Sequence, residues 1–448
     1  MLRYGFIIAV IHCMLPLSSG AAENTLDLHQ SIQLALQYNP RIEIARQACL
    51  QSQGRLTQAQ SGYLPQVDIA GSYGRNHLND LEPLEEDNVG YGTIGASQLI
   101  YDFGRTTGGI AAGRHGLDAS RHNYVRLLQN VVFDVKTRYY LLLERKWLVA
   151  VAREAVENFR QHADRAKELF AVGVRTKIDV TNAQVMLSNA RLDLLKAESN
   201  AKSARIAFEK ALGTVPHGGN YSLVSDKDSP QQAAASKPPL DMTLEAILST
   251  ALQSHPVLLS TRALLLAAQS SVNQEKGGYF PAFNAFAGYD TYETELSGYY
   301  DQWQLGVGLR WNIFSGFYTK GKVAEAMGRQ QELQARLRDL QLAVTKEATE
   351  SYLRAEESSR SVDLAAEILD LAAENLEVAE GRYKEGLSDV IEFNDAQFNQ
   401  TRSQSDFLNA YYAYLISLAR IEKATGVVPE LAALPDSVFT SCSSITAP

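Results

Sequence analysis

The chain has little cysteine, little proline and no long hydrophobic run, and each shortage narrows what it can be. Three cysteines in 448 residues are too few for a disulfide-stabilised scaffold. Thirteen prolines fall below the share of about 5% that is usual in proteins, so long uninterrupted helices can form. Beyond residue 22 no stretch of about 18 consecutive apolar residues occurs, so we expect no membrane-spanning helix.

An excess of basic residues is also missing. The 42 lysines and arginines are outnumbered by 51 aspartates and glutamates, which gives a formal net charge of −9. Proteins that bind nucleic acid normally present a basic face, so we expect no nucleic-acid partner. Hydrophobic residues make up 45% of the chain and charged residues 21%, which is the ordinary balance of a folded protein.

Motifs of enzymes and cofactor sites are missing as well. The sequence has no nucleophile elbow, no P-loop and no paired cysteines. Residues 90–95 match the G-x-G-x-x-G pattern of dinucleotide-binding proteins, but they lie within a strand pattern instead of between a strand and a helix. The eight histidines are scattered and form no cluster with cysteine or carboxylate. We therefore expect no enzyme activity, no cofactor and no metal site.

The first 22 residues have the features of a signal peptide. Arg3 supplies a positive charge, an apolar stretch follows, and the small residues 18–22 offer a cleavage site after Ala22. The alternative, an N-terminal membrane helix, would need about 20 apolar residues, more than this stretch has.

The cysteines leave two questions open. Cys13 could carry a lipid anchor, but the bulky His12 before it is unusual for a lipoprotein signal. Once the signal peptide is removed, Cys49 and Cys442 remain. They could form a single disulfide in an oxidising compartment, and the sequence does not decide it.

Four segments of the first half recur in the same order in the second half, at spacings of 213 to 216 residues. The pairs are 35–40 with 251–256, 62–65 with 278–281, 173–184 with 386–397, and 211–213 with 424–426. This order predicts a tandem duplication. The predicted parts are a first repeat over 23–213, a linker over 214–242, a second repeat over 243–426 and a tail over 427–448.

Each repeat is predicted to hold a helix, a pair of strands and a pair of long helices. The first helix should begin near Thr25 or Thr243, which are plausible N-caps, and break at Pro40 or Pro256. The pattern predicts strands at about 65–104 and 281–316, and long helices at about 110–213 and 320–426. The fold class is therefore mainly α with a small β part.

The clearest strand pattern begins at Trp303. Apolar residues occupy every second position and share one face: Trp303, Leu305, Val307, Leu309, Trp311 and Ile313. The two tryptophans are eight residues apart, or about 26 Å along a strand. That is close to the apolar band of an outer-membrane barrel between its aromatic girdles, so Trp303 and Trp311 are candidate membrane-interface residues. Four strands cannot close such a barrel, so several chains would have to contribute strands.

The long helices show coiled-coil-like periodicity. Apolar residues recur every three or four positions in three groups: Leu128, Val131, Val135, Tyr139 and Leu142; Leu333, Leu337, Leu340 and Val344; Leu364, Ile368 and Leu371. The proline-free segment 116–170 alone would be about 80 Å long as one helix. Gly173 and Gly386 follow the long helices where C-terminal glycines belong, which predicts two helical hairpins.

Carboxylates gather at the turns of these hairpins. Asp179 lies at the first turn, and Glu392 and Asp395 lie at the second, three residues apart and able to share one helix face. They could simply stabilise helix N-termini. If chains assemble around an axis, the same residues would form a carboxylate ring that favours cations.

Taken together, these features resemble the TolC family of outer-membrane efflux channels over nearly all of the mature chain. The resemblance rests on the duplicated halves, the Gly-Tyr-x-Pro element before each strand pair, the closing segments 100–104 and 313–316, and the acidic hairpin turns. It implies a homotrimer in which duplicated helix, β-hairpin and long-helix units form an α-helical barrel in the periplasm. The three chains would also share one 12-stranded transmembrane β-barrel, which lies in the outer membrane at one end of the trimeric α-helical barrel.

The resemblance also implies roles for single residues. Asp179, Glu392 and Asp395 fall on positions that constrict the periplasmic entrance, and Tyr383 falls on a tyrosine that helps to latch it. The best-known member of the family has arginines where Ser388 and Tyr411 stand, so an identical ionic latch is not expected.

The expected function is that of a passive exit duct in a tripartite efflux or type I secretion system. The partners implied by the resemblance are a periplasmic adaptor (membrane fusion) protein, an inner-membrane pump and outer-membrane lipid. The sequence does not separate drugs, metals, peptides and proteins as cargo. A soluble periplasmic coiled-coil adaptor or scaffold is the alternative, because the long helices fit it equally well.

Overall fold

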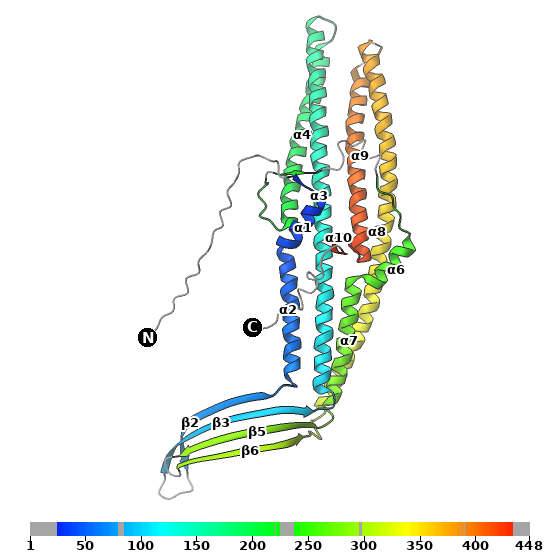
Figure 1. The fold of residues 1–448 in the computed structure, drawn as a ribbon. Coiled ribbons are helices and arrows are strands. Elements are labelled where there is room, and N and C mark those ends of the chain that lie inside the picture. The colour runs from blue at the N-terminus through cyan, green and yellow to red at the C-terminus, as the bar shows by residue number, and fades with distance from the viewer. Residues whose placement is uncertain are drawn as a thin grey trace.

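Long helices dominate the computed structural model, and a four-stranded sheet lies at one end of them (Figure 1). The structure describes residues 25–78, 85–219, 221–224, 237–294, 298–385, 387–388 and 390–432. No helix within these ranges is both long and apolar enough to cross a membrane.

The two halves of the chain have matching elements. The first half runs through β1 (Thr25–Leu26), α1 (Leu28–Tyr38), α2 (Pro40–Ser61), β2 (Gln66–Leu78), β3 (Glu85–Tyr101), α3 (Arg105–Ala171), α4 (Lys177–Leu212) and β4 (Ser222–Leu223). The second half runs through α6 (Leu244–Ser254), α7 (Pro256–Gly277), β5 (Ala282–Thr294), β6 (Gly298–Arg310), α8 (Tyr318–Lys384), α9 (Val390–Thr425) and α10 (Pro429–Ala432). The predicted fold class, mainly α with a small β part, is confirmed.

Paired helices of the two halves have equal lengths. α1 and α6 have 11 residues each, and α2 and α7 have 22. α3 and α8 have 67 residues each, and α4 and α9 have 36. At 1.5 Å per residue, α3 and α8 are about 100 Å long, and both run from the sheet to the opposite end of the molecule (Figure 1).

The short helices break where the prolines predict. Pro40 and Pro256 each occupy the first turn of a new helix, and the residue before each proline is extended and caps that helix. The predicted start at Thr243 is confirmed, because Thr243 is the N-cap of α6. In the first half the helix starts near Thr25, at Leu28, but Thr25 as its N-cap is wrong. Thr25 pairs with Ser222 in the parallel β1–β4 pair, and the N-cap of α1 is a carboxylate two residues further on.

That carboxylate belongs to Asp27. Its Oδ1 accepts a hydrogen bond of 2.6 Å from the backbone N–H of Gln30, whose side chain accepts one from the backbone N–H of Asp27. This reciprocal capping box satisfies two backbone donors at once.

The strands form one antiparallel sheet in the order β2-β3-β5-β6. β6 ends at Arg310, so Trp311 and Ile313 lie beyond the strand in which the alternation placed them. The chain turns there to enter α8, and the indole N–H of Trp311 donates a hydrogen bond of 3.1 Å to the carbonyl of Tyr279, next to the end of α7.

The helical core is centred on α3, which packs against α2, α4, α7 and α9. The predicted apolar face of α3 is confirmed, since Leu128, Val131, Val135, Tyr139 and Leu142 are all buried.

The predicted packing face of α8 is confirmed in part. Leu333 and Val344 are buried, and Leu337 and Leu340 pack against the core cluster that contains Val344. Leu364, Ile368 and Leu371 are 57–60% exposed in the single chain, because neighbouring positions such as Val362 and Leu369 face the core instead.

The ends of α4 and α9 lie against the helix breaks of the two halves. Gly213 follows α4 with φ +83°, and a Cβ there would lie 2.5 Å from Cα of Asn39. Gly426 follows α9 with φ +73°, and a Cβ there would lie 2.8 Å from Cα of His255. Only glycine fits both the left-handed backbone and the close approach.

Cys49 is fully buried in the core beside α3. Cys13 and Cys442 lie outside the described residues.

Candidate functional site: the tips of the two helical hairpins

The hairpins α3–α4 and α8–α9 turn at the end of the molecule that is opposite to the sheet (Figure 1). Gly173 at the first turn has φ +79°, which ends α3 as predicted. Gly386, the matching glycine of the second turn, lies outside the described residues. The structure therefore brings the predicted acidic residues and Tyr383 to the same end of the molecule, opposite to the sheet.

Asp179 lies in the first turn of α4 and acts there as a capping residue. Its Oδ2 accepts hydrogen bonds from the backbone N–H of Thr176 at 2.9 Å and from the hydroxyl of Thr176 at 2.8 Å. These bonds, the backbone one foremost, lower the pKa of Asp179. The simpler interpretation of this carboxylate, a stabilised helix N-terminus, is therefore an observed role, and the charge is retained.

Glu392 lies in the first turn of α9 and pairs with the end of α8. Its Oε1 is 3.1 Å from Nε of Arg382, and both side chains are about half exposed, at 45% and 49%. Asp395 is exposed one turn further along α9. Exposed pairs of this kind contribute at most about 1 kcal/mol, so the Arg382 pair mainly offsets the charge of Glu392.

Tyr383 lies in an aromatic cluster that joins the second hairpin to the first. Its ring stacks on Phe393 of α9 with centroids 5.4 Å apart and an interplanar angle of 17°. His162 of α3 touches both rings, with centroids 5.1 Å from Phe393 and 5.8 Å from Tyr383. The guanidinium carbon of Arg175, in the α3–α4 turn, lies 5.1 Å from the Tyr383 centroid, which is a cation–π distance.

Sequence reasoning missed His162, Phe393, Arg175 and Arg382. They come from four different segments, and no spacing along the chain indicates that they meet. One of the two departures from the family pattern, Tyr411, has a structural counterpart. Tyr411 is buried and stacks on Phe407, with centroids 6.2 Å apart, so it belongs to the core and not to an ionic latch.

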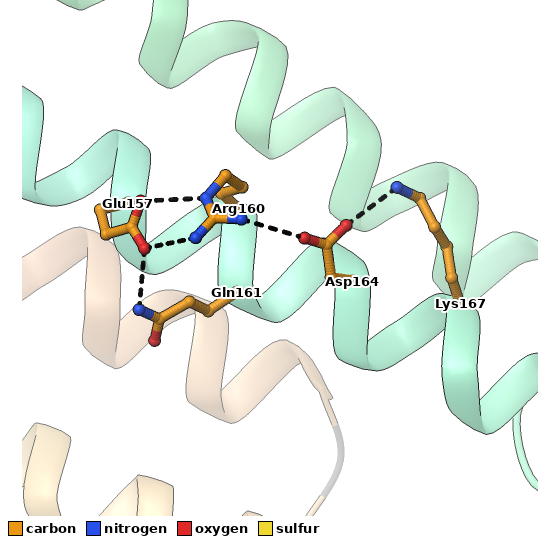
Figure 2. A network of polar contacts seen from close by, with 5 residues as sticks. All are labelled: Glu157, Arg160, Gln161, Asp164 and Lys167. Atoms are coloured by element: carbon orange, nitrogen blue, oxygen red, sulfur yellow. Dashed lines mark hydrogen bonds and ion pairs between the residues drawn. The ribbon is translucent and has the colours of Figure 1, made fainter.

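The opposite, exposed face of α3 near the tip carries a chain of ion pairs (Figure 2). Arg160 contacts Glu157 at 2.7 Å and Asp164 at 3.5 Å, and Asp164 contacts Lys167 at 3.0 Å. Hydrogen bonds from Arg160 and then Gln161 lower the pKa of Glu157 to about 2. Both carboxylates are bound to basic side chains along α3, and the lowered pKa keeps Glu157 ionised at neutral pH.

The sheet at the other end has two chemically different faces. One register row holds Ile69, Ile94, Tyr289 and Trp303, and their exposed fractions are 40–80%. The neighbouring row faces the other way and holds Ala70, Thr93, Asp290 and Gln302. On this polar face the carboxylate of Asp290 accepts hydrogen bonds from the hydroxyl of Tyr91 at 3.3 Å and the amide of Gln302 at 3.4 Å.

Trp303 is 77% exposed on the apolar face of the edge strand β6, and Trp311 is 53% exposed beyond the end of that strand. The exposed apolar face of the sheet is thus bounded by aromatic side chains on the side of the helices. Such a surface is unusual for a soluble monomer and typical of an interaction with lipid or protein.

A family model described as outer membrane efflux protein matches residues 31–214 and 247–427. The chain belongs to the outer membrane efflux protein family. The resemblance seen in the sequence is thereby confirmed, and with it a location in the outer membrane.

Curated relatives of this outer membrane efflux protein match most of its length. Protein CyaE of Bordetella pertussis is 26% identical over 405 residues, which are 88% of this chain and 81% of CyaE. Outer membrane protein TolC of Vibrio cholerae is 22% identical over 386 residues, 84% of this chain and 85% of TolC. Outer membrane efflux protein BepC of Brucella suis is 25% identical over 284 residues, and the match spans 62% of this chain and 58% of BepC.

Solved structures show the same fold. The CmeC outer membrane channel of Campylobacter jejuni superposes with a TM-score of 0.79 at 18% identity, covering 89% of this chain and 85% of CmeC. A CusC structure gives a TM-score of 0.78 at 18% identity, covering 93% of this chain and 96% of CusC.

Proposed function

We propose that this chain is one subunit of a passive exit channel, the outer-membrane part of a tripartite efflux or type I secretion system. The sheet carries the proposal, because one face is apolar and exposed while β2 and β6 each have a single neighbour among the described strands. Open strand edges are unstable in lipid, where unpaired backbone groups find no partner. Three chains with four strands each would close a 12-stranded barrel without edges.

Exposed apolar stripes on the long helices support the assembly of several chains. On α8, six aliphatic residues are more than half exposed: Leu342, Leu353, Leu364, Ile368, Leu371 and Val378. The first three are eleven residues apart, a period that keeps a stripe on one side of a nearly straight helix. A second stripe on α4 contains Val185, Leu192 and Leu195. In a homotrimer, the first hairpin of one chain would cover the second hairpin of the next and form a hollow periplasmic cylinder.

The hairpin tips would then form the periplasmic entrance. Asp179, Glu392 and Asp395 of three chains would surround the axis and favour cations over anions. Tyr383 would help to hold the entrance closed through the aromatic cluster that it shares with the first hairpin. The channel has no catalytic step in this proposal. The energy comes from an inner-membrane pump, and a periplasmic adaptor protein meets the tips and opens them.

Reconstitution of the purified full-length protein into planar lipid bilayers tests this proposal. We expect a trimer by native mass measurement, discrete single-channel currents with cation preference, and retention in the membrane fraction after a carbonate wash. Release by carbonate as a monomer without channel activity would overturn the proposal and favour the alternative, a soluble periplasmic adaptor or scaffold.

A further inference from the structure

His162 lies at the contact between the two hairpins and is sealed from solvent. Its side chain is on α3 of the first hairpin, and it touches Tyr383 and Phe393 of the second. The residue is only 9% exposed, and its Nε2 is buried with no hydrogen-bond partner in the described structure. This nitrogen is already covered within one chain. A protonated imidazole would therefore place an unpaired N–H donor and a positive charge among rings.

The charged groups around His162 do not offset that charge. Arg165 follows on α3, and after burial it is the second cause that lowers the pKa of His162. Arg175 of the α3–α4 turn lies over the Tyr383 ring. On α3 the carboxylates of Glu157 and Asp164 bind Arg160 and Lys167 on the exposed face (Figure 2).

Among the described residues of the second hairpin, no carboxylate offsets a charge on the imidazole. At the start of α9, Glu392 pairs with Arg382 from the end of α8, and Asp395 is exposed. On α8, Glu380 pairs with Lys384. The two groups of the second hairpin that touch the His162 ring, Tyr383 and Phe393, are aromatic and neutral.

We propose that His162 is a pH-sensitive lock between the hairpins, which holds the tips together while neutral and releases them when protonated. The proposal rests on the proposed function only in that the tips are taken as the entrance of the channel. It predicts that mild acid on the periplasmic side favours opening without any partner protein.

The direction follows from proton linkage. In the closed state the pKa of His162 lies below its ordinary 6.5, because burial and Arg165 disfavour the charged form. In an open state with the ring in water the pKa returns to about 6.5. The closed state is therefore fully favoured above that value. As the pH falls below it, the open-to-closed ratio rises by up to about tenfold per pH unit for each histidine, until the closed-state pKa is reached.

Single-channel recording of the full-length protein at about pH 7.5 and about pH 5 tests the lock, with His162→Phe as the decisive variant. Phenylalanine keeps an aromatic ring in the cluster but cannot take a proton, and His162→Leu is a second variant that cannot titrate. His122→Gln is the matched control: His122 is also on α3, and its pKa is also lowered by burial, but no ring contact joins it to the second hairpin in the described structure. Hydrogen exchange of residues 155–170 and 390–400 reports the same opening without current.

We expect the wild type and His122→Gln to open at least about tenfold more at the lower pH, and both His162 variants to lose most of this dependence. In the hydrogen-exchange experiment, acidification should make the backbone amides of the wild-type tips exchange faster than those of His162→Phe at the same pH. Channels whose acid response survives in both His162 variants would overturn the lock. A protein that forms no channel at any pH would instead overturn the proposed function.

Discussion

Arg382 and Glu392 form an ion pair of 3.1 Å that links the last turn of α8 to the first turn of α9. The pair leaves the two acidic residues of this hairpin tip unequal. The guanidinium of Arg382 offsets the charge of Glu392, while Asp395 is exposed one turn further along the same helix. The local structure thus predicts that Glu392 and Asp395 contribute differently to cation preference, although the sequence pattern does not distinguish them.

The double variant Glu392→Gln with Asp395→Asn should reduce the preference of the channel for cations, because it removes the carboxylate ring at the entrance. Asp395→Asn alone should reduce it more than Glu392→Gln alone, because Arg382 already offsets Glu392. Reversal potentials in a salt gradient measure the preference.

Arg382→Gln serves as a control that should change cation preference in the opposite direction. It keeps a polar side chain but frees the charge of Glu392, so cation preference should increase. Unchanged selectivity in the double variant would remove the acidic ring from the mechanism.

Tyr383→Phe should leave channel opening nearly unchanged, whereas Tyr383→Ala should raise the open fraction. The reason is that the contacts described for Tyr383 use its ring: the stack on Phe393, the contact with His162 and the cation–π contact with Arg175. Aromatic pairs contribute about 0.5–1.5 kcal/mol each, so the alanine variant should shift the equilibrium roughly tenfold. If phenylalanine opens the channel as much as alanine, the hydroxyl and not the ring holds the tips.

Trp303 should be quenched strongly by brominated lipid, because its side chain is 77% exposed on the apolar face of the sheet. Fluorescence of the reconstituted protein measures this, and the effect should fall in Trp303→Phe. Trp147→Phe is the control, since Trp147 packs against the helical core and should contribute nothing to the quenching. Equal quenching in wild type and Trp303→Phe would contradict a lipid-facing position.

Gly213→Ala should lower thermal stability. The alanine Cβ would meet the Asn39 backbone at 2.5 Å, and φ +83° is strained for any L side chain. Strain of this kind costs about 1–3 kcal/mol. Gly54→Ala in α2 is the control, because its Cβ would meet nothing within 4 Å and alanine favours a helix by up to about 1 kcal/mol. Melting of the detergent-solubilised protein should separate the two variants, and a stable Gly213→Ala would contradict the close approach.

Glu209→Ala should loosen the segment that follows α4. The carboxylate of Glu209 accepts three backbone N–H bonds of 2.7–2.9 Å, from His217, Gly218 and Gly219. Burial alone would raise the pKa of Glu209, but these bonds outweigh it and lower the pKa. Loss of the acceptor removes three part-buried hydrogen bonds, each worth about 1 kcal/mol.

The pKa of Glu209 in the folded protein is below the ordinary 4.5. The stability that Glu209 contributes is therefore fully present above pH 4.5, and it is lost as the pH falls through the pKa of the folded state. Hydrogen exchange of residues 214–219 at neutral and acid pH measures it. Equal protection in wild type and Glu209→Ala would show that the bonds do not hold the segment.

Much of the local structure could be predicted from the sequence. Pro40 and Pro256 break the helices because proline has no backbone N–H to donate and disfavours a helical conformation of the residue before it. The Gly-Tyr-x-Pro elements end α2 and α7 for the same reason. The alternation around Trp303 assigned one face of β6, since side chains of a strand alternate by geometry. The N-cap of the first helix was misplaced because Thr25 and Asp27 are both good caps, and only pairing with Ser222 decides between them.

The sequence by itself determined the duplication, the element types and the acidic hairpin turns, because periodicity, caps and helix breakers act between near neighbours in the chain. Only the tertiary structure decided which faces pack. Leu364, Ile368 and Leu371 have the same spacing as buried residues but are exposed in the single chain. The cluster of His162, Arg175, Tyr383 and Phe393 was invisible in the sequence for the same reason. Contacts between segments far apart in the chain depend on how the long helices are set against each other, and no local spacing encodes that.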